Sequence, residues 1–204
     1  MLGTSMSKMP FLTIMKRLFD IVFSILSMII FAIPMAVIWL TIVLGGSRKI
    51  IFRQERIGYK GRPFTLYKFR SMKVNAEKNK DPQLFTENDK RQTRIGTFLR
   101  AHHLDEFPQL WNILKGDMSF VGYRPERKFY IDQIMQHDSR YERLYAIRPG
   151  IFSMATLYNG YTDTMEKMLI RLEMDLEYLD NHSLWIDLKI IWLTTSAILT
   201  GKKF

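Results

Sequence analysis

The chain has 204 residues, a formal net charge of +10 and no cysteine. A chain of this length can form one domain with a sizeable core, and the absence of cysteine excludes a disulfide framework, a metal–thiolate site and a catalytic thiol. The positive charge suits an anionic partner, such as membrane headgroups, nucleotide phosphates or nucleic acid.

A long apolar segment dominates the beginning of the chain. Residues 1–15 are expected to form a loosely ordered N-terminus, and Lys16 and Arg17 then precede a mostly apolar run over residues 18–44. This run exceeds the roughly 20 residues with which a helix crosses a bilayer. Basic residues flank both of its ends, so the positive-inside rule does not orient a straight crossing. The rule is satisfied if both ends lie on the cytoplasmic side.

Pro34 lies near the middle of this run, where it removes a backbone hydrogen bond and bends the helix. Ser24 and Ser27 are candidates for satisfying backbone carbonyls near the bend. Asp20 is expected to pair with Lys16, one helical turn earlier. From these residues alone, a kinked helix that crosses the membrane and a re-entrant helix that returns to the same side both remain open.

A β-hairpin is predicted next. Residues 50–57 and 64–72 mix β-branched and aromatic residues with charges, and residues 59–63 form a turn between them. The polar residues 74–91 are expected to form an exposed loop, and a helical pattern resumes over residues 94–100.

Two adjacent carboxylates, Asp105 and Glu106, lie where the next helix is expected to begin. Pro108 suits the first turn of this helix, and a Lys-Gly pair at 115–116 suits its end. An apolar face follows the carboxylates at helical spacing: Phe107, Leu110, Trp111 and Leu114. By spacing alone, an Asp at this place is usually a helix cap, although a helix N-terminus also favours an ionised carboxylate or a bound phosphate.

The second half of the chain predicts mainly helices. Residues 126–147 suit one or two amphipathic helices, and residues 148–151 suit a turn. A long helix is expected over residues 163–179, and it begins with a capping box formed by Asp163 and Glu166. Its apolar stripe is made of Met165, Met168, Leu169, Leu172, Leu176 and Leu179. Residues 183–200 are strongly apolar and contain two tryptophans, which suits a helix at the membrane interface with tryptophans at headgroup depth and the following lysines on phosphates.

Several long motifs, in order, resemble the bacterial sugar transferases, the small monotopic phosphoglycosyl transferases. They are KRLFD, FRQERIGYKGRPFTLYKFRSMK, LDEFPQLWNILKGDMSFVG followed by RPE, RPGI, and DLEYL with LWIDLKIIWLT. The resemblance covers nearly the whole chain. It implies an α+β, mostly helical fold in which residues 16–48 form a Pro-kinked re-entrant membrane helix. Residues 49–204 would then form a catalytic domain on the cytoplasmic face of the bacterial inner membrane, with a small β-hairpin and amphipathic interfacial helices.

The resemblance also implies a reaction, in which a sugar-1-phosphate moves from a UDP-sugar to undecaprenyl phosphate with release of UMP, initiating surface glycan synthesis. Asp105 would be the nucleophile, forming an aspartyl-phosphosugar, and would also touch Mg²⁺, with Glu106 as its partner carboxylate. Membrane lipids are expected partners and nucleic acid is not, and a homodimer is left open. Cations are needed at a pyrophosphate. The candidate substrate-binding residues are Lys68, Arg70, Arg100, Arg124, Pro125 and Arg148, each arginine being equally compatible with a surface or ion-pair role.

Two departures from the family pattern stand near these residues. Tyr123 occupies the place where many members have the first proline of Pro-Arg-Pro, and Tyr161 occupies the place of the arginine in Asn-Gly-Arg. They leave open the shape of the loop and one basic contact. His102 and His103 have no third metal ligand at suitable spacing, so a structural role is predicted for both.

Two other functions are compatible with parts of the sequence. The net charge would suit a non-catalytic, membrane-anchored basic binding module, although the charges are scattered and do not form one stripe. A glycosyl transferase that extends a lipid-linked sugar would release UDP in place of UMP.

Overall fold

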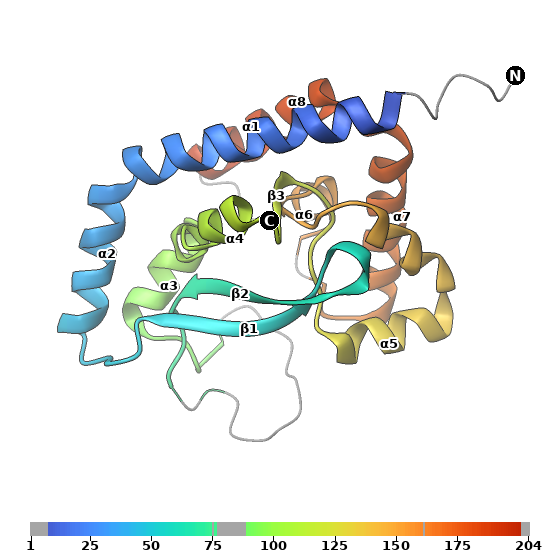
Figure 1. Cartoon of the computed structure of the whole chain (residues 1–204). Helices are drawn as coiled ribbons and strands as arrows, with labels where there is room; N and C mark the ends of the chain where they lie inside the picture. Colours follow the sequence, from blue (N-terminus) through green and yellow to red (C-terminus); the bar gives the residue numbers. More distant parts are fainter. Residues whose placement is uncertain (1–7, 75, 77–88, 161, 201–204) are drawn as a thin grey trace, which may run out of the picture.

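A computed structural model describes residues 8–74, 76, 89–160 and 162–200, and it shows an α+β, mostly helical fold, as predicted (Figure 1). Most of the predicted loop at 74–91, the departure at Tyr161 and the lysines after the last helix lie outside the described residues. The elements are α1 (Lys8–Ile30), α2 (Ala32–Leu44), β1 (Ile51–Ile57), η1 (Tyr59–Gly61), β2 (Pro63–Phe69), α3 (Arg94–Ala101), η2 (Leu104–Glu106), α4 (Gln109–Lys115), β3 (Ser119–Val121), α5 (Lys128–His137), η3 (Ser139–Ala146), β4 (Gly150–Phe152), α6 (Met154–Asn159), α7 (Met165–Asn181) and α8 (Leu184–Leu199).

The N-terminal apolar segment forms two helices that meet at Phe31. No single helix among the described residues is long and apolar enough to cross a membrane, but residues 13–30 and α2 pass that test together and are bent by 60°. Pro34 follows the break by three residues and cannot bind the carbonyl of Ile30, so the predicted bend is confirmed. Ser24 donates to the carbonyl of Ile21 at 3.0 Å, a full turn or more before the bend, so its predicted place near the bend is wrong.

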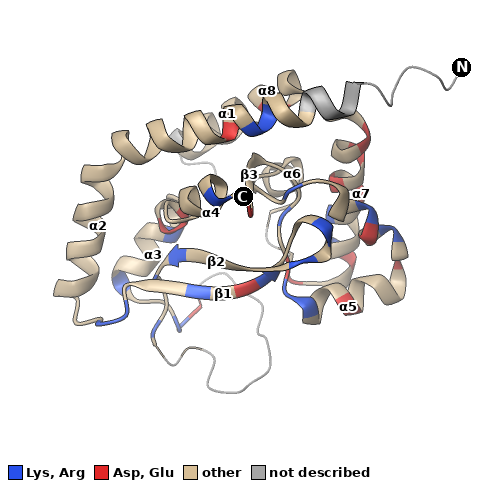
Figure 2. Ribbon diagram, viewed as in Figure 1, with Lys and Arg blue, Asp and Glu red and all other residues tan. Residues whose placement is uncertain are grey.

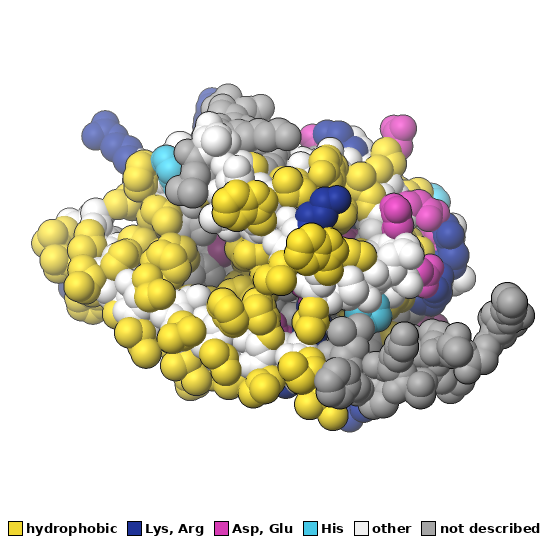
Figure 3. Space-filling model, turned by 90° about the horizontal axis from the view of Figure 1, so that it is seen from above, with side chains coloured by type: hydrophobic (Ala, Val, Ile, Leu, Met, Phe, Trp, Pro, Cys, Tyr) yellow, Lys and Arg dark blue, Asp and Glu magenta, His cyan; other side chains and the backbone are white. Residues whose placement is uncertain are grey.

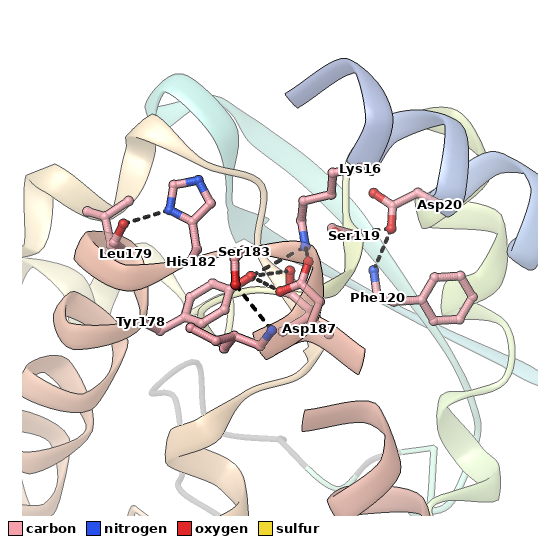
Figure 4. Close-up of polar contacts among 11 residues, drawn as sticks. Lys16, Asp20, Ser119, Phe120, Tyr178, Leu179, His182, Ser183 and Asp187 are labelled. Atoms are coloured by element: carbon pink, nitrogen blue, oxygen red, sulfur yellow. Dashed lines mark hydrogen bonds and ion pairs between the residues drawn. The ribbon is translucent and has the colours of Figure 1, made fainter. Parts of the chain in front are cut away.

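The start of α1 differs from its prediction in two ways. The helix begins at Lys8, so the loosely ordered N-terminus does not extend to residue 15. Lys16 does not use Asp20 as its partner but forms an ion pair with Asp187 of α8, which also accepts a 2.6 Å hydrogen bond from Tyr178 (Figure 4). The predicted ion pair between Lys16 and Asp20 does not form, because the fold brings the carboxylate of Asp187, on a distant helix, to the Lys16 amine.

Asp20 instead joins α1 to the middle of the fold, at β3. Its Oδ1 accepts hydrogen bonds from the Ser119 hydroxyl at 3.0 Å and from the Phe120 amide at 3.1 Å. Arg17 donates to the carbonyls of Ile113 and Leu114 at 2.6 and 2.8 Å, at the C-terminal end of α4. These contacts fasten α1 across the top of the domain, beside α8 (Figure 1).

The predicted hairpin is confirmed as an antiparallel pair with Arg53 opposite Tyr67 and Phe52 opposite Lys68. Because successive strand residues point to opposite faces, Tyr67 and Lys68 project to different sides of the hairpin. The hairpin carries many of the basic side chains, whereas α2 carries no charge (Figure 2).

A second, parallel pair of short strands was not predicted. Val121 of β3 pairs with Phe152 of β4, so residues 148–151 are not only a turn but lead into a strand. The two backbones approach closely: a Cβ added at Gly150 would lie 2.1 Å from the Gly122 nitrogen and 2.7 Å from the Phe152 oxygen. Only glycine fits there.

Gly150→Ala is expected to reduce the free energy of unfolding by about 3 kcal/mol or more, because the clashing atoms are backbone atoms that are themselves hydrogen-bonded. Thermal unfolding in detergent would measure this. Gly45→Ala is the matched control, since its φ is −72° and its nearest new contact is 3.3 Å. Equal unfolding midpoints for the two variants would contradict the prediction.

The main core lies between α5, η3 and α7. The predicted stripe of α7 is confirmed, with Met168, Leu172 and Leu176 buried. The predicted capping box is wrong: Thr164 caps α7 by accepting from the Lys167 amide, while Asp163 forms an ion pair with the Lys167 side chain.

One face of the molecule is strongly apolar. Seen from above, hydrophobic side chains cover much of the surface over α1, α2 and α8 (Figure 3). On α8 the side chains of Trp185 and Trp192 are 76% and 74% exposed, and Ile30 and Ile33 at the bend are 69% and 78% exposed. Soluble proteins rarely expose so large a contiguous apolar surface, so this face is one that a lipid phase or a partner would cover.

Candidate active site

The two central carboxylates lie in η2, a single 3₁₀ turn between α3 and α4. His103, with φ of 54°, turns the chain into η2, and α4 begins only at Gln109 with Pro108 as its cap residue. The prediction that a helix begins at Asp105 is therefore wrong by four residues. The turn nevertheless buries Asp105, whose exposure is 3%.

Lys68 faces these carboxylates from β2. Its amine donates to the Glu106 carboxylate at 2.5 Å, and both side chains are mostly buried. Burial by itself would raise the pKa of Glu106, but the cations of Lys68 and Arg124 outweigh it and lower that pKa to about 2. Glu106 is therefore ionised at neutral pH.

Asp105 responds differently to the same surroundings. Burial raises its pKa and the neighbouring Glu106 charge adds to this effect, while Lys68 and Arg100 oppose it. Burial also lowers the pKa of Lys68, against the attraction of both carboxylates. Two adjacent carboxylates with different pKa values form the kind of pair that active sites use.

A small hollow opens beside Glu106. Its lining brings together four of the predicted site residues, Lys68, Glu106, Arg124 and Pro125, and adds Arg56 of β1. Three cations and one carboxylate therefore line a hollow next to a buried Asp, which suits an anionic ligand such as a phosphate.

Two predicted arginines are engaged elsewhere. Arg148 donates to the carbonyl of Gly116 at 2.9 Å and lies 5.0 Å over the ring of Tyr59. Arg70 donates to the carbonyl of Lys49 at 2.6 Å and lies over the ring of Phe52. Neither lines the hollow, and their phosphate contacts stay a prediction. Arg100 is near enough to lower the pKa of Asp105.

Sequence reasoning missed a group of buried charges behind the hollow. Glu126 lies between Arg56 and Arg171, and Asp175 lies one turn further along α7. A usable signal existed for two of them: Arg171 and Asp175 are charged residues at i and i+4, beside the apolar stripe of α7.

The carboxylates also bear on the expected Mg²⁺. Magnesium is usually held by one or two carboxylates together with substrate phosphates and water, and Asp105 and Glu106 offer such oxygens. No group of three or more His, Asp or Glu side chains placed to hold a metal occurs within the described part of the chain. The site therefore fits Mg²⁺ held jointly by Asp105 and the phosphates of a substrate.

Comparison with known proteins identifies the family. A family model described as bacterial sugar transferase matches residues 11–201. The chain belongs to the bacterial sugar transferase family. It is 42% identical over 183 residues to the UDP-glucose:undecaprenyl-phosphate glucose-1-phosphate transferase of Escherichia coli (strain K12), and 36% identical over 192 residues to the UDP-N-acetylgalactosamine-undecaprenyl-phosphate N-acetylgalactosaminephosphotransferase of Aeromonas hydrophila.

These matches cover 89% and 94% of the chain but only 39% and 45% of those two relatives, so the sugar transferase spans less than half of their length. A UDP-glucose:undecaprenyl-phosphate glucose-1-phosphate transferase of Caulobacter vibrioides is 38% identical over 187 residues, which is 91% of the chain and 70% of that relative.

Within this sugar transferase, Tyr123 immediately precedes the RPE segment. It is fully buried in the main core, so an aromatic side chain fills space where many members have a proline. The Nδ1–H of His102 donates a 2.9 Å hydrogen bond to the carbonyl of Phe98, one turn earlier, in agreement with the structural role predicted for it. His103 provides the turn into η2, and burial lowers its pKa.

Proposed function

We propose that this sugar transferase moves a sugar-1-phosphate from a UDP-sugar to undecaprenyl phosphate, releases UMP, and thereby initiates surface glycan synthesis. The observation that carries the proposal is the buried Asp105 beside the ion-paired Glu106 and Lys68, next to a cation-lined hollow. The printed names of the relatives, which are undecaprenyl-phosphate sugar phosphotransferases, support the same donor and acceptor.

The proposed chemistry has two steps at one phosphorus atom. A carboxylate oxygen of Asp105 attacks the phosphorus that carries the sugar, the bond from that phosphorus to the bridging oxygen breaks, and UMP leaves with that oxygen. A phosphate oxygen of undecaprenyl phosphate then attacks the same phosphorus. The bond to Asp105 breaks, which regenerates the carboxylate and gives the lipid diphosphosugar.

The cations around the hollow suit this chemistry. Lys68 and Arg124 line the hollow, where they could neutralise negative charge on the donor phosphates, and Lys68 is already held by its ion pair with Glu106. Glu106, ionised and paired with Lys68, orients that amine. Mg²⁺ bound at Asp105 and the donor would neutralise further phosphate charge.

The same proposal places the protein on the cytoplasmic face of the inner membrane, as a monotopic protein with a re-entrant α1–α2 pair. The bend between these helices, the charge-free α2 and the exposed tryptophans of α8 support it. A membrane on the apolar face would cover α1, α2 and α8 together (Figure 3). The charged hairpin, which lies below α1 in Figure 2, would stay in water.

Topology is tested by labelling, because the chain has no cysteine of its own. Single cysteines at Thr13 and at Ser47 are both expected to react only with a reagent on the cytoplasmic side. Labelling of the Thr13 variant from the periplasmic side would contradict re-entry and favour a crossing helix.

The function is tested with a panel of nucleotide sugars and undecaprenyl phosphate. We expect one or more UDP-sugars to yield UMP together with a lipid diphosphosugar. Release of UDP would instead favour a glycosyl transferase, and salt-sensitive binding without any released nucleotide would favour a binding module.

A further inference from the structure

The segment Tyr123–Glu126 carries Arg124 to the hollow, and buried charges hold it from behind. Glu126 is 7% exposed, and each of its carboxylate oxygens meets a guanidinium: Arg56 of β1 at 3.1 Å and Arg171 of α7 at 2.8 Å. The backbone is held as well, because the Glu126 carbonyl accepts from the Ile57 amide at 3.1 Å.

Asp175 completes this arrangement from the next turn of α7. Its carboxylate accepts a hydrogen bond from the backbone amide of Arg124, and the side chain is 3% exposed. Its Oδ1 is buried and has no hydrogen-bond partner among the described residues. The amide that receives this bond belongs to the residue whose guanidinium lines the hollow.

Stability alone does not explain these groups. Buried ion pairs contribute little net stability compared with apolar side chains of the same size, because removing the charges from water costs about as much as their attraction returns. An apolar pair at Arg171 and Asp175 would extend the stripe of α7. The charges instead fix the direction of one backbone segment.

We infer that Asp175, together with Arg171, is a positioning residue for donor binding: it holds the Arg124 backbone so that the guanidinium faces Lys68 and Glu106. The inference rests on the proposed function, since the donor is a nucleotide diphosphosugar. It adds a residue on α7 that itself does not line the hollow.

The proposed two-step reaction makes a sharp test available. In such a reaction, kcat/KM for the donor reports only the first half-reaction and kcat/KM for the acceptor only the second. Asp175→Leu is expected to lower kcat/KM for the donor about tenfold or more, the effect of losing a hydrogen bond to a charged group, and to leave kcat/KM for the acceptor unchanged. A general loss of folded enzyme would lower both constants equally.

Asp175→Asn provides the second arm, because an amide oxygen can still accept the Arg124 amide. Its kcat/KM for the donor at pH 8 is expected to stay within about threefold of the unmodified enzyme, the size of a weakened but retained hydrogen bond.

The pH dependence separates the charge from the shape. Burial raises the pKa of Asp175 to about 7, against Arg171 and the Arg124 amide. The charged or titratable groups that face it are Arg124, Arg171, Glu126, Tyr123 and Tyr178. Burial raises the pKa of both tyrosines, arginines stay protonated, and the arginines outweigh burial to lower the pKa of Glu126, so Asp175 is the member of this group that titrates near 7.

The ionised carboxylate accepts the amide more strongly than the acid does. In the unmodified enzyme kcat/KM for the donor should therefore rise between pH 6 and pH 8. The kcat/KM for the donor of the unmodified enzyme, divided by that of Asp175→Asn, should also rise over this pH range, since all other titrating groups are common to both proteins.

Glu173→Gln is the matched control, since Glu173 lies on the same helix but forms an exposed ion pair with Arg140. Unchanged kcat/KM for the donor in Asp175→Leu would overturn the inference, as would a parallel fall in both constants. If Asp175→Leu does not fold, the inference is overturned when the ratio of kcat/KM for the donor between the unmodified enzyme and Asp175→Asn does not change with pH. Absence of UMP release by the unmodified enzyme would contradict the proposed function itself.

Discussion

Replacing Asp105 by alanine or asparagine is expected to lower transfer by at least about 10³-fold and to remove any covalent adduct formed with donor alone. The reason is that the proposed nucleophile is the carboxylate itself, and no other described carboxylate except Glu106 lies in this turn. Asparagine keeps the shape of the buried side chain, so this variant should remain folded and membrane-bound.

The measurement is mass spectrometry of enzyme mixed with a UDP-sugar in the absence of acceptor, together with UMP release. Asp117→Ala is the control, because Asp117 forms an ordinary ion pair with Lys115 at the end of α4. Appreciable transfer by Asp105→Ala would rule out the covalent mechanism.

Lys68→Met is expected to cost roughly 3–5 kcal/mol of stability at pH 7, the typical effect of leaving a buried charge without its partner. Activity should fall with it, because the cation is lost from the hollow. Lys115→Met, which breaks the more exposed pair with Asp117, should have little effect on either quantity.

The sign of the pH dependence follows from the pKa of Glu106. Because this pKa is lowered from 4.5 to about 2 in the folded state, the stabilisation is fully present above pH 4.5 and is lost as the pH falls toward 2. The difference in unfolding midpoint between the unmodified protein and Lys68→Met should therefore be large at pH 7 and should narrow below pH 4.5. A constant difference across this range would show that the Lys68–Glu106 pair does not stabilise the fold.

Local residue patterns predicted the helices and strands that carry a long, regular pattern of apolar residues in the sequence. The apolar stripe of α7, and the β-branched and aromatic residues of β1 and β2 on either side of a turn, each extend over enough residues to be recognised in the sequence. The strands β3 and β4 have three residues each, and their pairing depends on the contact between Gly122 and Gly150, which no nearby residue announces.

The site divides in the same way. Asp105, Glu106, Lys68 and Arg124 were found because they belong to motifs that carry the resemblance, and the structure brings Glu106, Lys68 and Arg124 together. Partners set by long-range packing were not found. The sequence predicts that Lys16 pairs with Asp20, four residues away, but its partner in the structure is Asp187, which lies 171 residues further along the chain.

The way α1 is fastened has a practical consequence for producing the enzyme. Side chains of α1 provide the hydrogen-bond or ion-pair partners of several polar groups elsewhere in the fold. These groups are the Ser119 hydroxyl, the Phe120 amide, two carbonyls of α4 and the Asp187 carboxylate. Deleting this helix to obtain a water-soluble fragment would leave those polar groups without partners. It would also expose to water the apolar residues that α1 now covers. Helix α1 is thus part of the framework of the molecule, and a chain shortened by this helix is expected to be destabilised.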